Sequence, residues 1–273
     1  MRLAVSSIAW PAGQDEAAAR ILVEAGVEGV EIAPTKVWDH PLSATPSDWA
    51  AYRNSWERRG LIVSSLQALL FGRPDLLMFG DSQSRKSTQQ HLNGMIGLAA
   101  ALGAGPLVFG SPKNRLVGDL SPAEADAIAV PFFRQLGEYA LKLKVVFCIE
   151  PNPPAYGCDY IKTAAEGLDL VARVDHPGFG LHLDAAGMTL AGDDPGSTFA
   201  TAERSGHWRH FHLSEPQLAP IDGSGTNHST FGSAVRASGH DGWAVIEMRD
   251  PGEGWEDTLR SSIRFAQDHY FCD

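Results

Sequence analysis

Four residues that can bind a cation or carry a proton close four short apolar segments in the second half of the chain. They are Glu150, Asp184, His212 and Glu247. A buried carboxylate costs free energy unless it is paired or coordinates a cation. A single residue of this kind would be explained by a buried ion pair, but four at successive segment ends favour one shared site for a divalent metal ion.

The types of these side chains narrow the choice of ion. Three carboxylates and one imidazole suit a fairly hard ion with octahedral coordination and open positions for substrate oxygens. We therefore expect Mn²⁺, with Mg²⁺, Co²⁺ or Zn²⁺ as alternatives. The three cysteines, Cys148, Cys158 and Cys272, show no CxxC spacing, so they indicate neither a zinc knuckle nor a disulfide framework. They fit a reducing, cytoplasmic setting.

Two more histidines precede the candidate ligands by two positions. His182 lies before Asp184, and His210 lies before His212. Because side chains alternate between the two faces of a strand, each histidine points the same way as the ligand that follows it. We expect His210 to lie deeper than His212, and His182 to have a structural or substrate-contact role.

Residues that could contact a substrate follow several of the apolar segments. Lys113 and Arg115 could hold a phosphate or carboxylate, since Arg offers a bidentate fork and Lys a point charge. A solvated turn held by Pro112 is the alternative. The other candidates for substrate contact are Gln67, Tyr156, His228 and Arg249.

Eight short apolar segments, each ending in a polar residue or a glycine or proline, recur at roughly even intervals. They span residues 3–8, 29–33, 61–66, 106–110, 145–150, 180–184, 210–214 and 243–248. Intervening stretches carry apolar residues at three- and four-residue spacing, as amphipathic helices do: 17–25, 87–102, 123–142 and 256–268. This alternation predicts an α/β protein with parallel strands.

A single (β/α)8 TIM barrel over residues 1–273 accounts best for this pattern. The first turn after a strand has no GxGxxG sequence, which disfavours a doubly wound dinucleotide-binding sheet, and no linker composition divides the chain. Active sites of such barrels lie at the C-terminal ends of the strands. The four candidate ligands all occupy that end.

Composition excludes some classes of partner. A net charge of −11 disfavours a nucleic-acid surface, and no apolar stretch reaches the roughly 20 residues needed to cross a membrane. We also expect no export signal before Gln14. These features predict a small-molecule enzyme, and we expect a dimer or tetramer.

At five of the segments the sequence resembles the xylose isomerase-like family of sugar phosphate isomerases and epimerases, which includes ketose 3-epimerases and hydroxypyruvate isomerase. The resemblance covers essentially the whole chain. It rests on the sequences GVEGVEI at 26–32, CIEPN at 148–152, LHLD at 181–184, HFHLSE at 210–215 and GWAVIEM at 242–248.

The resemblance implies roles for the four residues. It assigns Glu150, Asp184, His212 and Glu247 to one metal ion, and it gives Glu150 and Glu247 a second role as acid and base on opposite sides of the substrate carbon. The implied activity is isomerisation or epimerisation of a sugar, sugar phosphate or hydroxy-keto acid through an enediolate.

Three positions depart from the ketose 3-epimerase pattern and leave the substrate open. Gly187 replaces a histidine, Tyr156 an acidic residue and Leu218 an arginine. A metal-dependent lyase or dehydratase using the same enolate chemistry is the main alternative. An apurinic endonuclease, which needs more metal ligands and a basic face, and a non-catalytic sugar-binding barrel are further alternatives.

Overall fold

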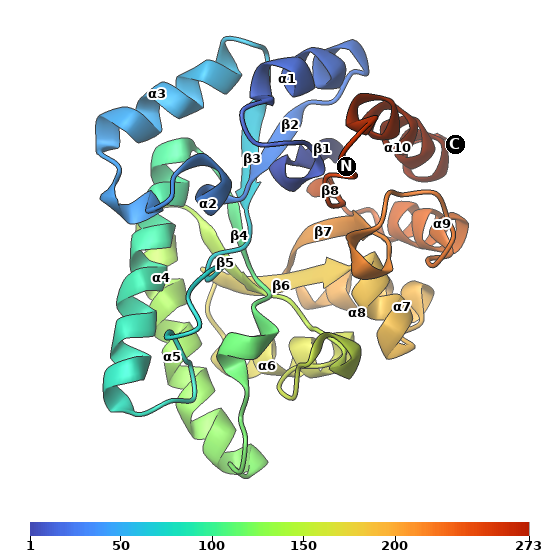
Figure 1. Cartoon of the computed structure of the whole chain (residues 1–273). Helices are drawn as coiled ribbons and strands as arrows, with labels where there is room; N and C mark the ends of the chain where they lie inside the picture. Colours follow the sequence, from blue (N-terminus) through green and yellow to red (C-terminus); the bar gives the residue numbers. More distant parts are fainter. Residues whose placement is uncertain (273) are drawn as a thin grey trace.

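Eight parallel strands pair in chain order, and the first pairs with the last, so the sheet closes into the predicted barrel (Figure 1). The computed structural model describes residues 1–272. The strands are β1 (Arg2–Ser6), β2 (Gly29–Ile32), β3 (Ile62–Leu66), β4 (Pro106–Phe109), β5 (Val146–Ile149), β6 (Phe179–Asp184), β7 (Trp208–Ser214) and β8 (Trp243–Glu247). All eight predicted segments are therefore strands.

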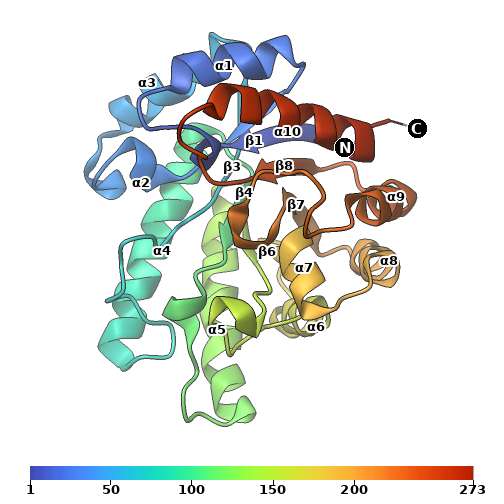
Figure 2. The same ribbon diagram turned by 45° about the vertical axis from the view of Figure 1, so that its right-hand side comes forward.

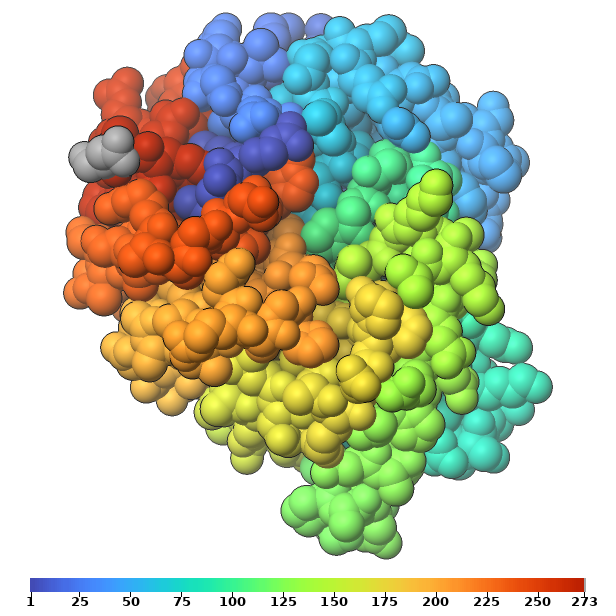
Figure 3. Space-filling model, turned by 180° about the vertical axis from the view of Figure 1, so that it is seen from behind, coloured from blue at the N-terminus to red at the C-terminus, as the bar shows by residue number. Residues whose placement is uncertain are grey.

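Helices cover the outside of the barrel in chain order, as Figure 2 shows from a second direction. They are α1 (Asp15–Glu24), α2 (Pro34–Val37), α3 (Pro46–Glu57), α4 (Ser82–Leu102), α5 (Pro122–Lys142), α6 (Ala164–Val174), α7 (Ala185–Ala191), α8 (Pro195–Ser205), α9 (His228–Ser238) and α10 (Trp255–Tyr270). Figure 3, from behind, shows the first residues in blue packed beside the orange-red residues near β8. No helix within residues 1–272 has the length and apolar character of a membrane span.

Helix starts follow from local capping. Helix α4 begins five residues before the predicted stretch, because the Asp81 carboxylate accepts a hydrogen bond from Ser84 N at 2.7 Å and caps it. Thr163 Oγ1 caps α6 by accepting from Glu166 N at 3.2 Å. Such caps satisfy backbone donors that have no partner inside the helix.

An aromatic cluster fixes the wall of the barrel against α5. Phe133 stacks on Phe179 with a centroid distance of 4.9 Å, and Phe109 and Phe147 lie at 5.9 and 6.4 Å from Phe133. All four rings are fully buried. They tie α5 to β4, β5 and β6, two of which end at candidate ligands.

The interior of the barrel is polar near its C-terminal end. In the strand register Glu31 lies between Ser6 and Ser65, Asp184 lies beside His212, and Ser214 lies beside Glu247. Alternating side chains of neighbouring strands form layers inside such a barrel. This register gathers carboxylates and histidines in adjacent layers below the mouth.

Candidate active site

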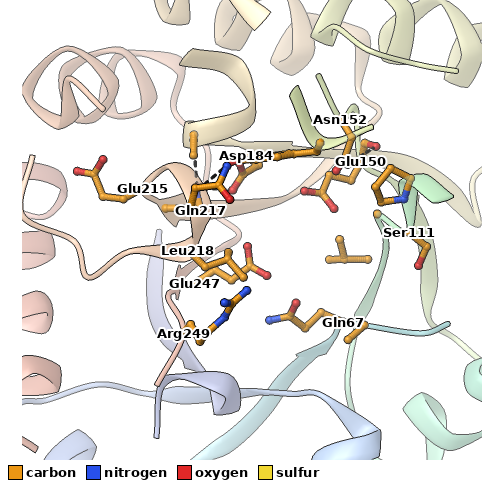
Figure 4. Close-up of a pocket in the computed structure, with 17 residues that line it drawn as sticks. Gln67, Ser111, Glu150, Asn152, Asp184, Glu215, Gln217, Leu218, Glu247 and Arg249 are labelled. Carbon is orange, nitrogen blue, oxygen red and sulfur yellow. Dashed lines mark hydrogen bonds between the residues drawn. The ribbon is translucent and has the colours of Figure 1, made fainter. Parts of the chain in front are cut away.

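A cavity of about 290 Å³ opens at the C-terminal ends of the strands. Glu150, Asp184 and Glu247 reach it from the ends of β5, β6 and β8, and Figure 4 shows their carboxylates directed into the same space. The remaining wall comes from loops after the other strands. Its residues are Gln67, Ala68, Val108, Gly110, Ser111, Pro112, Asn152, Tyr156, Ala186, Ser214, Glu215, Gln217, Leu218 and Arg249.

His212 lies beneath this cavity and joins two glutamates. Its Nδ1 is 3.2 Å from Glu247 Oε2, and its Nε2 is 3.1 Å from Glu31 Oε2. Among residues 1–272, no group forms a hydrogen bond with Nδ1. Burial would lower the pKa of His212, but the charges of Glu31 and Glu247 outweigh it and hold the pKa well above the usual range.

Asp184 is fixed by the start of α7. Its Oδ1 accepts from Gly187 N at 2.6 Å, and its Oδ2 accepts from the Ser214 hydroxyl. Burial and the nearby charge of Glu247 raise the pKa of Asp184 to about 6. Ligand atoms of Asp184, His212 and Glu247 lie within 4.8 Å of one another.

Glu150 follows the last residue of β5 and packs against the end of β4. A Cβ at Gly110 would overlap Glu150 Oε2, so glycine leaves the space that this carboxylate occupies. Burial, together with the charges of Asp184 and Glu247, raises the pKa of Glu150 to about 8.

These four residues fit a divalent cation. Three carboxylates converge on the cavity, none of them in a salt bridge with a lysine or arginine among residues 1–272, and the unpartnered Nδ1 of His212 faces Glu247. A cation at this place would supply the missing charge and a partner for Nδ1. The donor set of oxygens and one nitrogen suits a hard or intermediate ion.

Three of the predicted substrate contacts line the cavity. The Gln67 amide donates to Ser6 Oγ at 2.5 Å, and the Tyr156 hydroxyl accepts from Gln217 N at 3.4 Å. Figure 4 shows the Arg249 guanidinium directed into the cavity near Glu247. Of the residues that the structure describes, Arg249 is the one basic side chain in the cavity wall.

The structure places Lys113 and Arg115 outside the cavity wall, in contrast to the predicted anion clamp. Lys113 is exposed on a short 3-10 turn. Arg115 is fully buried behind the site, where its Nη2 donates to the backbone oxygen of Glu150 at 2.6 Å and its guanidinium lies over the Phe109 ring. The turn carries both side chains away from the cavity.

Two predicted histidine contacts also lie outside the cavity wall. His182 is fully buried, and its Nδ1 is 3.0 Å from His210 Nδ1, deeper in the barrel. His228 begins α9 and has Glu215 Oε1 at 3.1 Å and Tyr270 Oη at 2.6 Å as its partners. Both imidazoles therefore belong to buried networks.

The sequence pattern gave no role to several residues that shape the site. Glu31 lies within the second apolar segment, yet only the closed barrel brings it to His212. Four non-glycine residues of the cavity wall have positive φ, a strained conformation that often marks functional sites: Ala68, Ser111, Gln217 and Leu218.

The three departures from the epimerase pattern lie in or beside this cavity. Tyr156 and Leu218 form part of its wall. Gly187 is buried at the start of α7, where its N–H holds Asp184. These three positions therefore bring less charge to the cavity than an acidic residue, a histidine and an arginine would.

Comparison with solved structures supports the fold. D-psicose 3-epimerase from Clostridium cellulolyticum H10, solved with D-tagatose, superposes with a TM-score of 0.78 at 16% identity, covering 100% of both chains. The 3-keto-D-glucoside 4-epimerase of E. coli gives 0.80 at 17% identity, covering 98% of this chain and 99% of that one. The probable 3-DHS dehydratase from Bacillus anthracis gives 0.70 at 18%, covering 98% and 99%.

Sequence comparison gives the family. No protein of curated function matches the chain. A model of the xylose isomerase-like TIM barrel family matches residues 19–269, which is most of the sequence. The chain therefore belongs to the xylose isomerase-like TIM barrel family.

Proposed function

We propose that this protein is a divalent-metal-dependent isomerase or epimerase of a small, carbohydrate-like α-hydroxy ketone. The observation that carries the proposal is the convergence of Glu150, Asp184 and Glu247 on one cavity, with His212 directly below. Two solved structures of similar fold add support, since one is a D-psicose 3-epimerase with D-tagatose and the other a 3-keto-D-glucoside 4-epimerase.

Glu150, Asp184, His212 and Glu247 would hold the ion, with Mn²⁺ as the first choice. When bound, a divalent ion supplies positive charge beside the hydroxy-ketone oxygens, which makes the neighbouring C–H more acidic. Asp184 is held by Gly187 N and Ser214, so its contribution is to bind and orient. It is the cluster member with most hydrogen bonds from its own neighbours.

Glu150 and Glu247 would move the proton. They reach the cavity from β5 and β8, so a substrate carbon between them has a carboxylate on each side (Figure 4). One carboxylate oxygen takes the proton as the C–H bond breaks and its electron pair enters the enediolate. The other glutamate, protonated at the start, gives its proton to the opposite face, which inverts the centre. Proton return to the adjacent carbon, with the hydroxyl hydrogen moving to the former carbonyl oxygen, would instead isomerise the substrate.

Substrate recognition would fall to the three predicted contacts that line the cavity. Gln67 and Tyr156 can bond to hydroxyl groups, and Arg249 can bind a carboxylate or phosphate. A cavity of about 290 Å³ is at the small end of ligand sites, which suits a single sugar unit.

The test is solvent proton exchange. Metal-saturated enzyme is incubated in D₂O with a panel of ketoses that includes D-fructose, D-tagatose, phosphorylated ketoses and hydroxypyruvate, and deuterium uptake is followed by NMR. We expect uptake at one carbon, reduced about 10²- to 10⁴-fold in Glu150→Gln and in Glu247→Gln. No uptake with any member, or uptake unchanged in both variants, would overturn the proposal.

A metal-dependent dehydratase is the second candidate. One solved structure of similar fold is described as a probable 3-DHS dehydratase, and elimination needs the same proton abstraction next to a carbonyl. The D₂O experiment separates the two, because an unsaturated product would indicate elimination. Deuterated ketose without elimination indicates isomerisation or epimerisation.

A further inference from the structure

Glu31 is a fully buried carboxylate that does not line the cavity. Its Oε2 accepts from Ser65 Oγ at 2.8 Å and lies 3.1 Å from His212 Nε2. His210 Nε2 is farther away, at 3.7 Å. A charge in this position is costly, so its partners must account for it.

The two nitrogens of His212 face different surroundings. Nε2 faces Glu31, and Nδ1 faces Glu247 and the cavity above. Carboxylates accept hydrogen bonds, and within residues 1–272 only Nε2 has hydrogen-bond geometry to one, that of Glu31, so the hydrogen of the neutral imidazole belongs on Nε2. Nδ1 then presents its lone pair to the cluster of Glu150, Asp184 and Glu247.

We infer that Glu31 is a positioning residue for this site: it holds the His212 ring and its Nε2–H, so that Nδ1 is the atom that binds the ion. The inference rests on the metal-binding part of the proposed function. Carboxylates in this relation to a metal-binding histidine fix its ring and raise its basicity. Ser65 in turn holds Glu31 in place.

The decisive substitution is Glu31→Gln, which keeps the size of the side chain and removes its charge. The amide can present N–H instead of oxygen to Nε2, which would favour the wrong form of the imidazole. We expect Mn²⁺ affinity to fall about 10- to 100-fold, the range for loss of such a partner. Glu31 does not reach the cavity, so this loss would not come from a direct contact with the ion.

A matched control exists in the same chain. Glu215 Oε1 is also 3.1 Å from an Nε2, that of His228, and both residues are buried. The other nitrogen of His228 faces Tyr270 Oη, and His228 lies outside the cavity wall although Glu215 is part of it. The control is therefore made at the histidine, and His228→Ala should leave Mn²⁺ affinity unchanged.

The experiment titrates metal-free wild type, Glu31→Gln, His228→Ala and Asp184→Asn with Mn²⁺ by calorimetry. The inference predicts weaker binding by Glu31→Gln and wild-type binding by His228→Ala. Wild-type affinity in Glu31→Gln, with binding lost in Asp184→Asn, would overturn the inference alone. Absence of binding by wild type would instead overturn the metal-dependent function.

A second measurement needs no substitution, so it decides the question even where Glu31→Gln fails to fold. Long-range ¹H–¹⁵N NMR of the wild type loaded with Zn²⁺ reports which nitrogen of each histidine carries hydrogen. We expect Nε2–H and metal-bound Nδ1 for His212. Hydrogen on Nδ1 would overturn the inference.

Discussion

Two buried glutamate–histidine pairs in this molecule have the same local geometry but different surroundings. Glu31–His212 and Glu215–His228 both join a carboxylate oxygen to Nε2 at 3.1 Å. Glu31 has one further hydrogen bond, from Ser65. Glu215 accepts from the backbone N–H groups of residues 223, 225 and 226, so it organises the loop before α9.

The two pairs differ in the group that faces Nδ1 of the histidine. His212 Nδ1 faces a carboxylate of the cavity, whereas His228 Nδ1 faces a tyrosine hydroxyl in the packed exterior. The same pair of side chains can therefore prepare a ligand or fasten a loop. Residue type does not distinguish the two pairs. The position of the histidine does, because His212 lies on β7 whereas His228 begins α9.

The largest predicted effect is the loss of Mn²⁺ affinity in His212→Ala, compared with the same substitution at His228. His212→Ala deletes a proposed ligand, so its loss of Mn²⁺ affinity should exceed the roughly 100-fold expected for an indirect change. His228→Ala should keep that affinity and lower stability by about 1–3 kcal/mol, because Glu215 loses a buried partner. Calorimetry and urea unfolding measure the two quantities. Equal affinity losses would erase the distinction between the pairs.

A second comparison concerns the room for an added methyl group at two glycines, Gly110 beside the cavity and Gly97 in α4. Gly110→Ala places a methyl group on Glu150 Oε2 and should displace that carboxylate, lowering solvent exchange about 10²-fold. Gly97 lies within α4 with no atom in reach of an added Cβ, so Gly97→Ala should raise stability by about 0.5–1 kcal/mol. Exchange and unfolding assays check both. Normal exchange by Gly110→Ala would show that Glu150 does not need its present position.

A third comparison is between two basic side chains, Arg249 in the cavity wall and Lys113 outside it. With an anionic ketose, Arg249→Ala should raise KM about tenfold or more, since a hydrogen bond to a charged group contributes about 1.5–3 kcal/mol. Lys113→Ala should leave KM unchanged, because Lys113 is exposed outside the cavity wall. Steady-state kinetics measure both. A larger effect at Lys113 would restore the anion clamp predicted from sequence.

The smallest effect concerns pH and metal-free stability. The folded pKa of Glu150 is about 8, above the unfolded value of about 4.3, so between these values the folded protein binds more protons. Stability relative to Glu150→Gln should thus fall as pH rises from 6 to 7, by at most about 1.4 kcal/mol.

For Glu124, the contribution to stability should change with pH in the opposite direction. It lies on the exposed start of α5, where hydrogen bonds from Ser121 lower its pKa. Its contribution is present above the unfolded pKa and is lost as pH falls through the folded value. Unfolding of Glu124→Gln across pH should show this trend, and the same trend in both variants would contradict the assignment for Glu150.

Strand ends could be predicted because alternation and punctuation are local properties of the sequence. Glu150, Asp184, His212 and Glu247 close neighbouring strands, and the barrel brings such positions together whatever the loops do. Glu31 needed the closure of the barrel as well, because residues 31 and 212 meet across its interior.

Loop side chains could not be placed in this way. Arg115 was predicted in the cavity, but the turn that follows Ser111, whose φ is 30°, carries it behind Glu150. His228 follows a loop whose course depends on the hydrogen bonds of Glu215. Glycines serve different needs that the sequence does not separate: Gly103 has a positive φ, whereas a Cβ at Gly178 would overlap Gly137 O.

Metal content tests the central claim most directly. Purified protein is loaded with Mn²⁺, freed of excess ion and analysed by mass spectrometry for bound metal, in parallel with Asp184→Asn. We predict one equivalent per chain in the wild type and a marked loss in the variant. Less than about one tenth of an equivalent in correctly folded wild type would contradict the account.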